Sequence, residues 1–357
     1  MCLQKLDIYR VRNIVNASIR PATFNLIYGQ NGSGKSSLLE AIFILGRASS
    51  FRTNNVRNII NENFADLVVS GQVEQENGIL THLGIQFTGK ECEIHINQNS
   101  KCKRSDLAYA LPIQLIHPKS YQLLDGGSGI RREFIDWGLF NQNDTFLSIW
   151  RNYKKTLLQR NAILKSRLIK QIAVWDNELV TYAKQLTILR AQYLEELSPF
   201  FYENCRYFLN LKNISIKFLP GWDSESDFLA LLHQDLEKDL RYGFTQHGPH
   251  RSDFSLMVNN KLAKDFVSRG QLKLLVLSLK IAQIQLLRLR SSKMACILID
   301  DLTAELDIFN RNIFLDHLIN LKIQVFISAT ELNEFGDFQS HQSLQVFHVE
   351  HGKIQQA

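Results

Sequence analysis

Residues 24–46 read FNLIYGQNGSGKSSLLEAIFILG, and this stretch decides the fold. It predicts a short apolar strand, a glycine-rich loop and an amphipathic helix that begins near Lys35. The loop fits the pattern G-x-x-x-x-G-K-[ST], whose glycines let the backbone wrap closely around a polyphosphate at the positive end of the helix. A glycine-rich turn that fits by chance is the alternative, but strand, loop and helix occur in the order that phosphate binding requires. The sequence therefore predicts a nucleotide-binding α/β domain.

The residue types of this loop suit ATP and Mg²⁺. We expect Lys35 to reach the β- and γ-phosphates, and the Ser36 hydroxyl to bind Mg²⁺. Ser37 is either a further phosphate contact or helix surface. The expected phosphate-binding residues are Gly29, Gln30, Asn31, Gly32, Ser33, Gly34, Lys35, Ser36 and Ser37.

A second apolar run supplies the carboxylates that such a site needs. Residues 294–299 are continuously apolar, as in a strand covered on both faces of a parallel sheet, and Asp300 and Asp301 follow them. Asp300 suits the metal shell, and Asp301 can orient or deprotonate the attacking water. Two acids that merely cap a helix are the alternative for this run when it is taken alone.

The distance along the chain between these two halves indicates an inserted lobe. Lys35 and Asp300 lie 265 residues apart, whereas a compact nucleotide-binding core needs only one or two hundred residues. Residues 139–198 contain no Gly or Pro, and their leucines and isoleucines recur at helical spacing. Folded as a hairpin, this segment gives arms of roughly 40 Å, too short for long coiled coils. Alternating segments in residues 66–97 predict a small antiparallel sheet.

These patterns predict an ATPase lobe formed by residues 1–115 and 240–357, and a helical lobe formed by residues 116–239.

The composition, 45% hydrophobic and 21% charged, is that of a globular protein. A net charge of +6 suits an anionic partner such as nucleic acid. The five cysteines are scattered, which signals neither disulfides nor a zinc site. Charges at the N-terminus and the lack of a long apolar run predict a cytoplasmic protein without a membrane partner.

Three motifs in sequence order resemble those of ABC-type ATPases: the loop at Gly29, residues 268–271 and the strand before Asp300. The SRGQ of residues 268–271 resembles the Leu-Ser-Gly-Gly-Gln signature of that superfamily. The resemblance implies a dimer that encloses two nucleotides, each held by one chain and faced by the signature of the other. The alternative is that the serine only caps the next helix. The signature residues are Ser268, Arg269, Gly270 and Gln271.

Further positions resemble ABC-type motifs individually. TAELD at 303–307 resembles the D-loop that ends at Asp307, and FISAT at 326–330 resembles the strand before the switch position, here Thr330. Gln114 resembles the glutamine that reaches Mg²⁺ and the attacking water, although a lone glutamine in a strand is also a common structural residue. Arg12 and Asn13 resemble an Arg-Asn pair near the nucleotide, with a surface turn as the alternative.

Longer segments, from about residue 10 to residue 330, resemble the RecF family of bacterial recombination-mediator ATPases. LLDGGSGIRREFIDW at 123–137 resembles its Gly-Gly…Arg-Arg-x-Phe-x-Asp stretch, and QHGPHRSDF at 246–254 its Gly-Pro-His-Arg segment. SSFRT at 49–53 also matches. Lys119 and Ser128 depart from the family pattern, which has an acid and a proline there, but neither belongs to the phosphate chemistry. The matching residues in the first segment are Gly126, Gly127, Arg131, Arg132 and Asp136.

The resemblance implies a weak Mg²⁺-dependent ATPase whose ATP-bound homodimer clamps DNA and whose hydrolysis releases it. It also implies RecR and RecO as partners, assistance to RecA loading at gaps, and a role in recombinational repair, replication restart and the SOS response. DNA contacts are expected mainly at phosphates, because no sequence-reading motif is present. Candidate contacts are the basic runs at 101–104 and 151–155 and the pair His250-Arg251, although such runs are often solvated surface and such a histidine is often structural.

Other classes of ATPase share part of this pattern. An ABC transporter subunit is disfavoured by the helical insert, the altered signature and Thr330. An ATP-gated nuclease of the overcoming-lysogenization-defect type needs an additional acid-rich metal domain, for which we expect no room after the switch strand. A clamp that does not hydrolyse ATP differs only in turnover.

Overall fold

In the computed structural model the described residues are 2–75, 77–89, 91–209, 211, 213–223, 226–291, 295–302, 306–335 and 344–356. The chain divides into two compact units, one of residues 1–120 and 287–357 and one of residues 121–286. The second boundary therefore lies at 287, not at the expected 240. The reason is that β9 (Asp253–Val258) pairs with β8 (Ile214–Leu219), so this part of the chain belongs to the helical unit.

The first unit contains a six-stranded sheet in the order β14-β13-β3-β12-β11-β7. All neighbours run parallel except β13 and β14. The strands β11 and β12 are buried along their whole length, which the apolar run at 294–299 predicts for β11. Carboxyl ends of parallel strands meet at one edge, which is where open α/β sheets bind ligands. The bounds are β3 (Phe24–Tyr28), β7 (Ile113–Ile116), β11 (Cys296–Ile299), β12 (Gln324–Ala329), β13 (Leu344–Glu350) and β14 (Lys353–Gln356).

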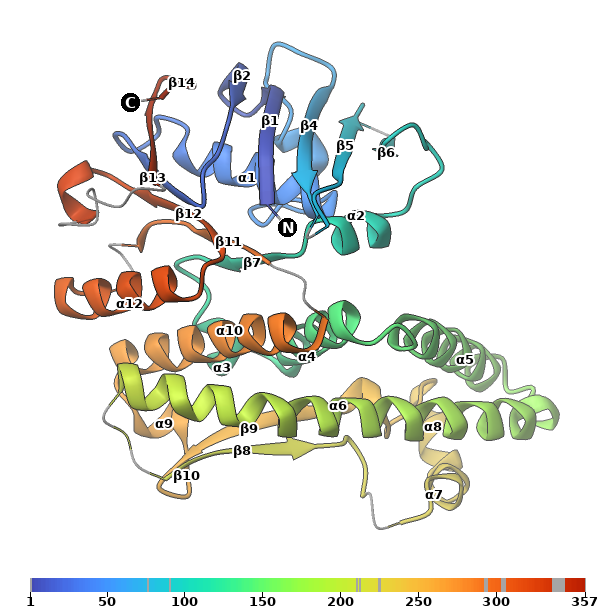
Figure 1. The fold of residues 1–357 in the computed structure, drawn as a ribbon. Coiled ribbons are helices and arrows are strands. Elements are labelled where there is room, and N and C mark those ends of the chain that lie inside the picture. Colours follow the sequence, from blue (N-terminus) through green and yellow to red (C-terminus); the bar gives the residue numbers. More distant parts are fainter. Residues whose placement is uncertain are drawn as a thin grey trace. The chain divides into compact units, whose positions relative to one another are not determined.

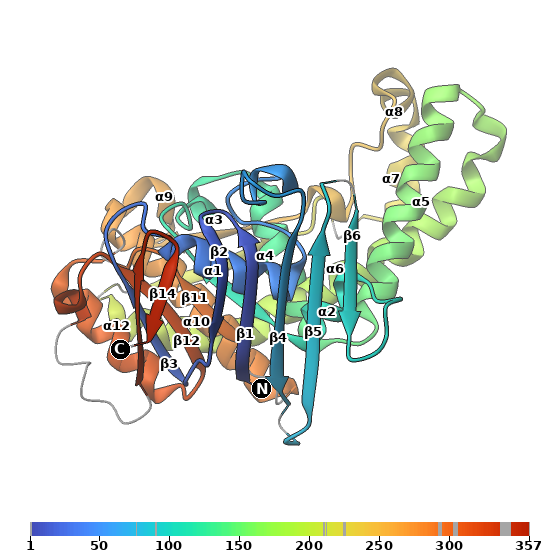
Figure 2. The same ribbon diagram turned by 90° about the horizontal axis from the view of Figure 1, so that it is seen from above.

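An antiparallel sheet in the order β2-β1-β4-β5-β6 completes the first unit, and Figure 2 shows these strands side by side. It contains the expected sheet of residues 66–97 and is extended by the two N-terminal strands. The apolar face of α1 (Lys35–Arg47) forms one core with β1 and β4 through Leu38, Ile42 and Leu45. The other bounds are β1 (Cys2–Val11), β2 (Ile14–Ile19), β4 (Leu67–Glu74), β5 (Leu80–Phe87), β6 (Cys92–Ile96), α2 (Arg104–Ala110) and α12 (Ile308–Asn320).

The second unit is mainly helical, and Figure 1 shows α6 (Ile172–Phe208) running along β8 and β9 with α5 (Phe146–Ser166) beside it. The helix α6 continues beyond residue 198, where the pattern free of proline ends. Proline inside a helix removes a hydrogen bond, but here Leu197 and Phe201 are fully buried on either side of Pro199, so packing maintains the helix. Other bounds are α3 (Gln122–Asp125), α4 (Ser128–Gln142), α7 (Phe228–Gln234), α8 (Leu236–Tyr242), α9 (Ala263–Phe266), β10 (Lys261–Leu262) and, across the unit boundary, α10 (Arg269–Ser291).

Candidate functional site

The phosphate loop, residues 29–36, has a backbone that only glycine accepts at three positions. Gly29, Gly32 and Gly34 have φ angles of +152°, +80° and +122°, a region that other residues rarely adopt. A Cβ atom on Gly29 would lie 2.2 Å from the carbonyl oxygen of Val349. The loop therefore depends on glycine for its shape and for the space that it occupies.

Two segments distant in sequence hold the phosphate loop in place. Asn13 donates from Nδ2 to the carbonyl oxygen of Ser33 at 2.9 Å and accepts at Oδ1 from the Ser37 hydroxyl at 2.9 Å. The turn between β13 and β14 supports the other side, because the amide of Gly352 donates to the same Ser33 oxygen at 2.8 Å. A Cβ atom on Gly352 would lie 2.0 Å from the carbonyl oxygen of Asn13, so this close approach requires glycine. No sequence motif indicated this support.

Arg12, beside Asn13, is held by a buried carboxylate on α1. Its guanidinium donates to both oxygens of Glu40, at 2.8 and 3.0 Å, and Glu40 has no exposed surface. Ser50 also donates to Glu40, and Arg52 lies 3.8 Å from it. One buried acid thus anchors two arginines that line the same pocket. The match of SSFRT to the family contains Arg52, but no sequence pattern links Arg52 to Glu40.

The two acids after β11 meet the start of α1. The Ser36 hydroxyl donates to Asp300 Oδ1 at 2.8 Å, and the Ser328 hydroxyl donates to the same oxygen at 3.0 Å. The Asp301 amide donates to the Ser328 hydroxyl at 2.9 Å, and the Asp301 backbone has a φ angle of +56°. Ser328 was not predicted, although a hydroxyl near the end of the apolar strand β12 was the available signal.

These oxygen atoms suit Mg²⁺, which prefers hydroxyl, carboxylate, phosphate and water ligands. Over the described residues, no group of three or more His, Cys, Asp or Glu side chains could hold a metal by itself. The donor set of Ser36 and Asp300 therefore fits an ion that shares its remaining ligands with a nucleotide.

Lys35 is folded back on the phosphate loop. Its Nζ donates to the carbonyl oxygens of Gly29 and Gln30 at 2.6 and 3.0 Å. Burial lowers the pKa of Lys35, and the nearby carboxylates of Asp301 and Asp300 act in the opposite direction. The cavity beside it has a volume of about 400 Å³. Its lining residues are Arg12, Asn13, Asn31, Gly32, Gly34, Lys35, Ser36, Ser37, Arg52, Pro118, Asp300, Asp301, Ser328 and Thr330.

Three expected site residues lie at different places in this unit. Gln114 is buried within β7, in register with Ile297 and two residues before the strand ends, so its assignment to the metal stays a prediction. Thr330 lines the cavity, and its carbonyl oxygen accepts from the Gly29 amide at 3.3 Å. Asp307 caps α12 by accepting from the Asn310 amide at 2.8 Å, which lowers the Asp307 pKa. Residues 303–305 of the expected D-loop lie outside the described residues.

The signature segment forms a complete helix cap in the second unit. Ser268 accepts at Oγ from the Gln271 amide at 3.2 Å, and Gln271 Oε1 accepts from the Ser268 amide at 3.0 Å. This reciprocal pair is a capping box, so the expected capping role of Ser268 is confirmed. Gly270 is exposed, and the nearest atom to a Cβ built there is the Ser268 hydroxyl at 3.9 Å. Packing within the unit therefore does not require a glycine at this position.

Comparison with known proteins decides the family. The sequence profile described as RecF/RecN/SMC N terminal domain matches residues 2–355. A Shewanella denitrificans protein named DNA replication and repair protein RecF is 40% identical over 357 residues, which cover 99% of each chain. The chain belongs to the RecF family.

Other RecF-family proteins and solved structures agree with this. A Shewanella halifaxensis protein with the same name is 41% identical over 99% of this chain and 98% of its own. A structure of the recombination mediator protein RecF-ATP in the RecFOR pathway superposes with a TM-score of 0.87 at 24% identity, over 99% and 97% of the two chains. The Smc head domain of Pyrococcus furiosus gives 0.60 at 14% identity, over 99% and 95%. The predicted fold, an ABC-type ATPase head with an inserted helical lobe, is confirmed.

The two longest RecF-like segments of the sequence meet inside the helical unit. Arg131 donates to both oxygens of Asp253 at 2.6 and 2.9 Å, and Arg132 donates to the carbonyl oxygen of Ser252 at 2.8 Å. Arg190 joins them, because it donates to both oxygens of Asp136 and to the Ser252 hydroxyl. These segments, which resembled the RecF family separately, therefore form one ion-paired network.

His250, a candidate for the site or for DNA, is fixed within this unit. Its Nδ1 lies 2.7 Å from the Tyr153 hydroxyl, and its Nε2 lies 3.0 Å from the carbonyl oxygen of Thr245. Burial lowers the pKa of His250 to about 4, so the ring is neutral at pH 7. The ring thus has a structural role here, while the neighbouring Arg251 is exposed beside Phe244.

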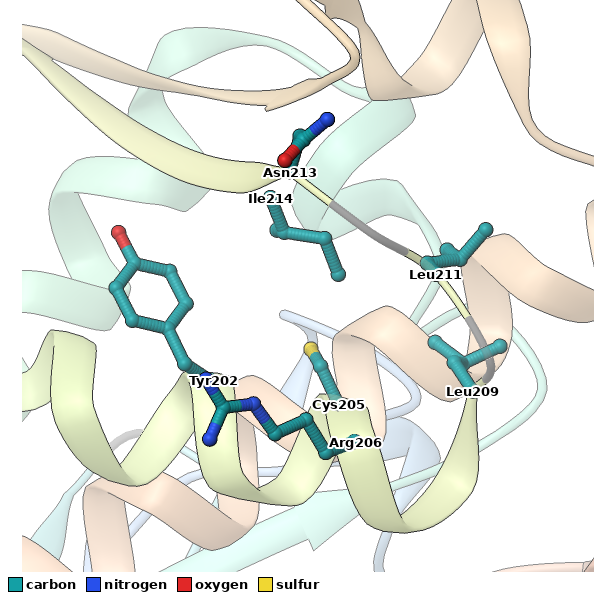
Figure 3. A pocket seen from close by; sticks show the side chains of 7 residues that line it. All are labelled: Tyr202, Cys205, Arg206, Leu209, Leu211, Asn213 and Ile214. Carbon is teal, nitrogen blue, oxygen red and sulfur yellow. The ribbon is translucent and has the colours of Figure 1, made fainter.

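A second cavity, of about 510 Å³, lies between the end of α6 and the start of β8 (Figure 3). Tyr202 uses its hydroxyl to accept from the Ile216 amide at 3.3 Å, and burial raises the pKa of Cys205 to about 12. The thiol therefore stays protonated, and among the described lining residues Arg206 is the charged one. The described part of this lining contains no pair of an acid and a base. In the described part of the chain, no helix is both long and apolar enough to span a bilayer.

Proposed function

We propose that this RecF-family protein is an ATP-dependent DNA-binding protein of recombinational repair and replication restart. The observation that carries the proposal is that Lys35 and Ser36 meet Asp300 in one cavity, although 264 positions separate Ser36 from Asp300. A phosphate loop, a hydroxyl and a carboxylate in this arrangement are the parts that bind a nucleoside triphosphate and its metal ion. Slow hydrolysis of ATP to ADP and phosphate follows as the proposed reaction.

Each residue has a role that its contacts support. The amides of the phosphate loop hold the phosphate oxygens, and Lys35 exchanges the Gly29 and Gln30 carbonyls for a phosphate. Ser36 and Asp300 hold Mg²⁺, which offsets phosphate charge when bound. Asp301 has its amide fixed by Ser328, so its carboxylate can orient the attacking water.

The signature of each chain faces the nucleotide of a second copy. Ser268, Arg269 and Gly270 are all exposed at the start of α10, and their unit gives no packing reason for the glycine. A hydroxyl, a guanidinium and an unobstructed helix N-terminus suit a phosphate that approaches from another chain. ATP is then enclosed between two copies, and its hydrolysis separates them.

The remaining partners follow from the relatives. RecF structures are described as part of the RecFOR pathway, and the curated relatives are named DNA replication and repair proteins. We therefore propose RecR and RecO as partners, assistance to RecA loading at gapped DNA, a role in the SOS response and a cytoplasmic location. The chain binds DNA mainly through phosphates.

Sedimentation tests this proposal directly. The protein is measured with ADP and with a non-hydrolysable ATP analogue, each with and without gapped DNA. We expect a dimer only with the analogue, and comigration with DNA in that state. A protein that sediments identically with both nucleotides and never with DNA would contradict the proposal. Turnover of ATP, measured separately, distinguishes an ATPase from a clamp that does not hydrolyse.

A further inference from the structure

The helix α5 and the turn after it contain an unusual charge pattern. Residues 145–175 include no Asp or Glu, although the whole chain has 35 of them. The same 31 residues include seven Lys and Arg. Soluble helices normally mix both signs, and acids placed one turn from bases stabilise them. Residues 145–175 contain no acid that could stabilise the helix in this way.

Most of these cations lie on one side of α5. Arg151, Lys154, Lys155 and Lys165, here called the basic stripe, are all exposed. At 3.6 residues per turn they share one face, which extends over roughly 21 Å. The opposite face is buried and includes Tyr153, Ile163 and Leu164.

The buried arginine of α5, unlike the basic stripe, is paired with carboxylates. Arg160 has no exposed surface and donates to Asp176 and Asp239, both at 2.6 Å. Among the described residues, no ion pair involves a member of the basic stripe. Arg151 and Lys155 are also one turn apart, so their like charges destabilise the helix. A surface that retains this repulsion between positive charges suits a negatively charged partner, which would neutralise them.

The composition of the stripe favours nucleic acid as that partner. The apolar face of α5 is buried within the unit, so it is not available to enter a membrane. Leu158 is the large apolar residue exposed between the cations. A line of cations without acids matches a polyanion whose charges repeat along its length.

We propose that the basic stripe of α5 contacts the phosphate backbone of DNA. This inference rests on the proposed DNA-binding function and assigns part of it to one surface. The contacts are sequence-independent, because lysine and arginine at phosphates position the duplex without distinguishing bases. Lys154, whose ammonium lies 4.8 Å from the Trp150 ring, is held at the edge of this surface.

The test compares two double variants of the full chain that each remove two positive charges. Arg151→Gln with Lys155→Gln alters the stripe. Lys184→Gln with Lys238→Gln is the matched control, since these exposed lysines of the same unit lie near Asp227 and Asp235. Affinity for a duplex and for gapped DNA is measured over a range of salt concentrations, with the non-hydrolysable ATP analogue present.

We expect the stripe variant to bind about tenfold more weakly at ~0.1 M salt, with a salt slope smaller by about 1.8 for two lost contacts. Its melting temperature stays the same or rises, because a like-charge pair has been removed. The control keeps the wild-type slope.

The inference is overturned if both variants lose affinity equally, or if wild type binds DNA and the stripe variant matches it. If the variant loses binding to anionic vesicles but not to DNA, a membrane is the partner and the inference fails. Wild type that binds no DNA under any condition overturns the proposed function as well.

Discussion

Two glycines, one in each unit, differ in why the chain needs them. At Gly29 the backbone has a φ angle of +152°, and a side chain would overlap the Val349 carbonyl oxygen at 2.2 Å. At Gly270 the residue lies in the first turn of α10, and the space for a side chain is empty to 3.9 Å. Glycine is unfavourable inside a helix, so its presence at 270 has a cost that the unit itself does not offset.

This difference separates a requirement of folding from a requirement of assembly. The phosphate loop is complete within its own unit, because Asn13, Gly352 and Asp300 all contact it there. The signature has a complete cap but carries an exposed arginine and an unneeded glycine. We infer that the second segment is shaped by a ligand on another chain, and the predictions below test that distinction.

The largest effect is expected from Lys35→Met, which removes the charge that offsets the phosphates. Among the described residues that line the cavity Lys35 is the one lysine, so ATP-dependent dimerisation should be abolished. Sedimentation with the ATP analogue and a nucleotide-binding assay measure this. Lys35→Arg is the companion variant, because it keeps the charge and changes the geometry. Wild-type ATP affinity and dimerisation in Lys35→Met would remove the phosphate loop from the mechanism.

Ser268→Arg should leave the phosphate loop intact and block the partner's nucleotide. The variant is expected to bind ATP yet to fail in dimerisation and turnover. Mixed with Lys35→Met, it should restore roughly a quarter of wild-type turnover, because about half of the dimers are mixed and each has one intact site. Full dimerisation and turnover by Ser268→Arg alone would make residues 268–271 only a helix cap.

Asp301→Asn should keep ATP binding and the dimer while turnover falls. The substitution preserves side-chain size and leaves Asp300 and Ser36 in place. Removing a group that orients or deprotonates water typically costs about 10²- to 10⁴-fold in rate. Single-turnover hydrolysis measures the chemical step apart from product release. Unchanged turnover would assign the water to another residue, and Gln114 in β7 is then the next to substitute.

The parts of this site that the sequence predicts are those with a local signature. The phosphate loop, the strand before Asp300 and the cap at Ser268 each follow from a few adjacent residues, and β3, β11 and α1 lie where the pattern places them. Ser328 and Gly352 were not predicted. The Ser328 contact with Asp300 depends on the pairing of β12 with β11, and the Gly352 contact with Ser33 depends on the β13–β14 turn, which joins residues 319 positions apart.

The unit boundary shows a second limit of the sequence. Residues 240–286, which include the signature, are expected in the ATPase lobe. In the structure β9 pairs with β8, and Arg131 is bound to Asp253. Antiparallel pairing and ion pairs over such separations leave no periodic pattern in the sequence. The resemblance of residues 268–271 to an ATPase motif therefore did not predict that they lie in the helical unit.

Gly29→Ala should destabilise the first unit and thereby abolish nucleotide binding. The added methyl must displace the Val349 carbonyl or distort a backbone with positive φ, at a cost of at least ~2 kcal/mol. For a unit of this size that lowers the melting temperature by roughly 4–8 °C. Differential scanning calorimetry measures the shift. Gly32→Ala is the matched control, because a side chain there contacts nothing within 4 Å and meets only the backbone strain.

Gly270→Ala should change the stability of the fold least, and it should raise that stability where Gly29→Ala lowers it. Alanine in a first helical turn with empty space around it is expected to stabilise α10 by about 0.5–1 kcal/mol. The methyl would nevertheless lie where the partner's nucleotide approaches. An overpacking cost of ~1–3 kcal/mol there corresponds to a roughly 5- to 150-fold loss of ATP-dependent turnover. Calorimetry and turnover are therefore measured on the same sample. A variant that is more stable and equally active would mean that nothing approaches Gly270. A less stable variant would mean that the helix itself needs the glycine, and the contrast with Gly29 would disappear.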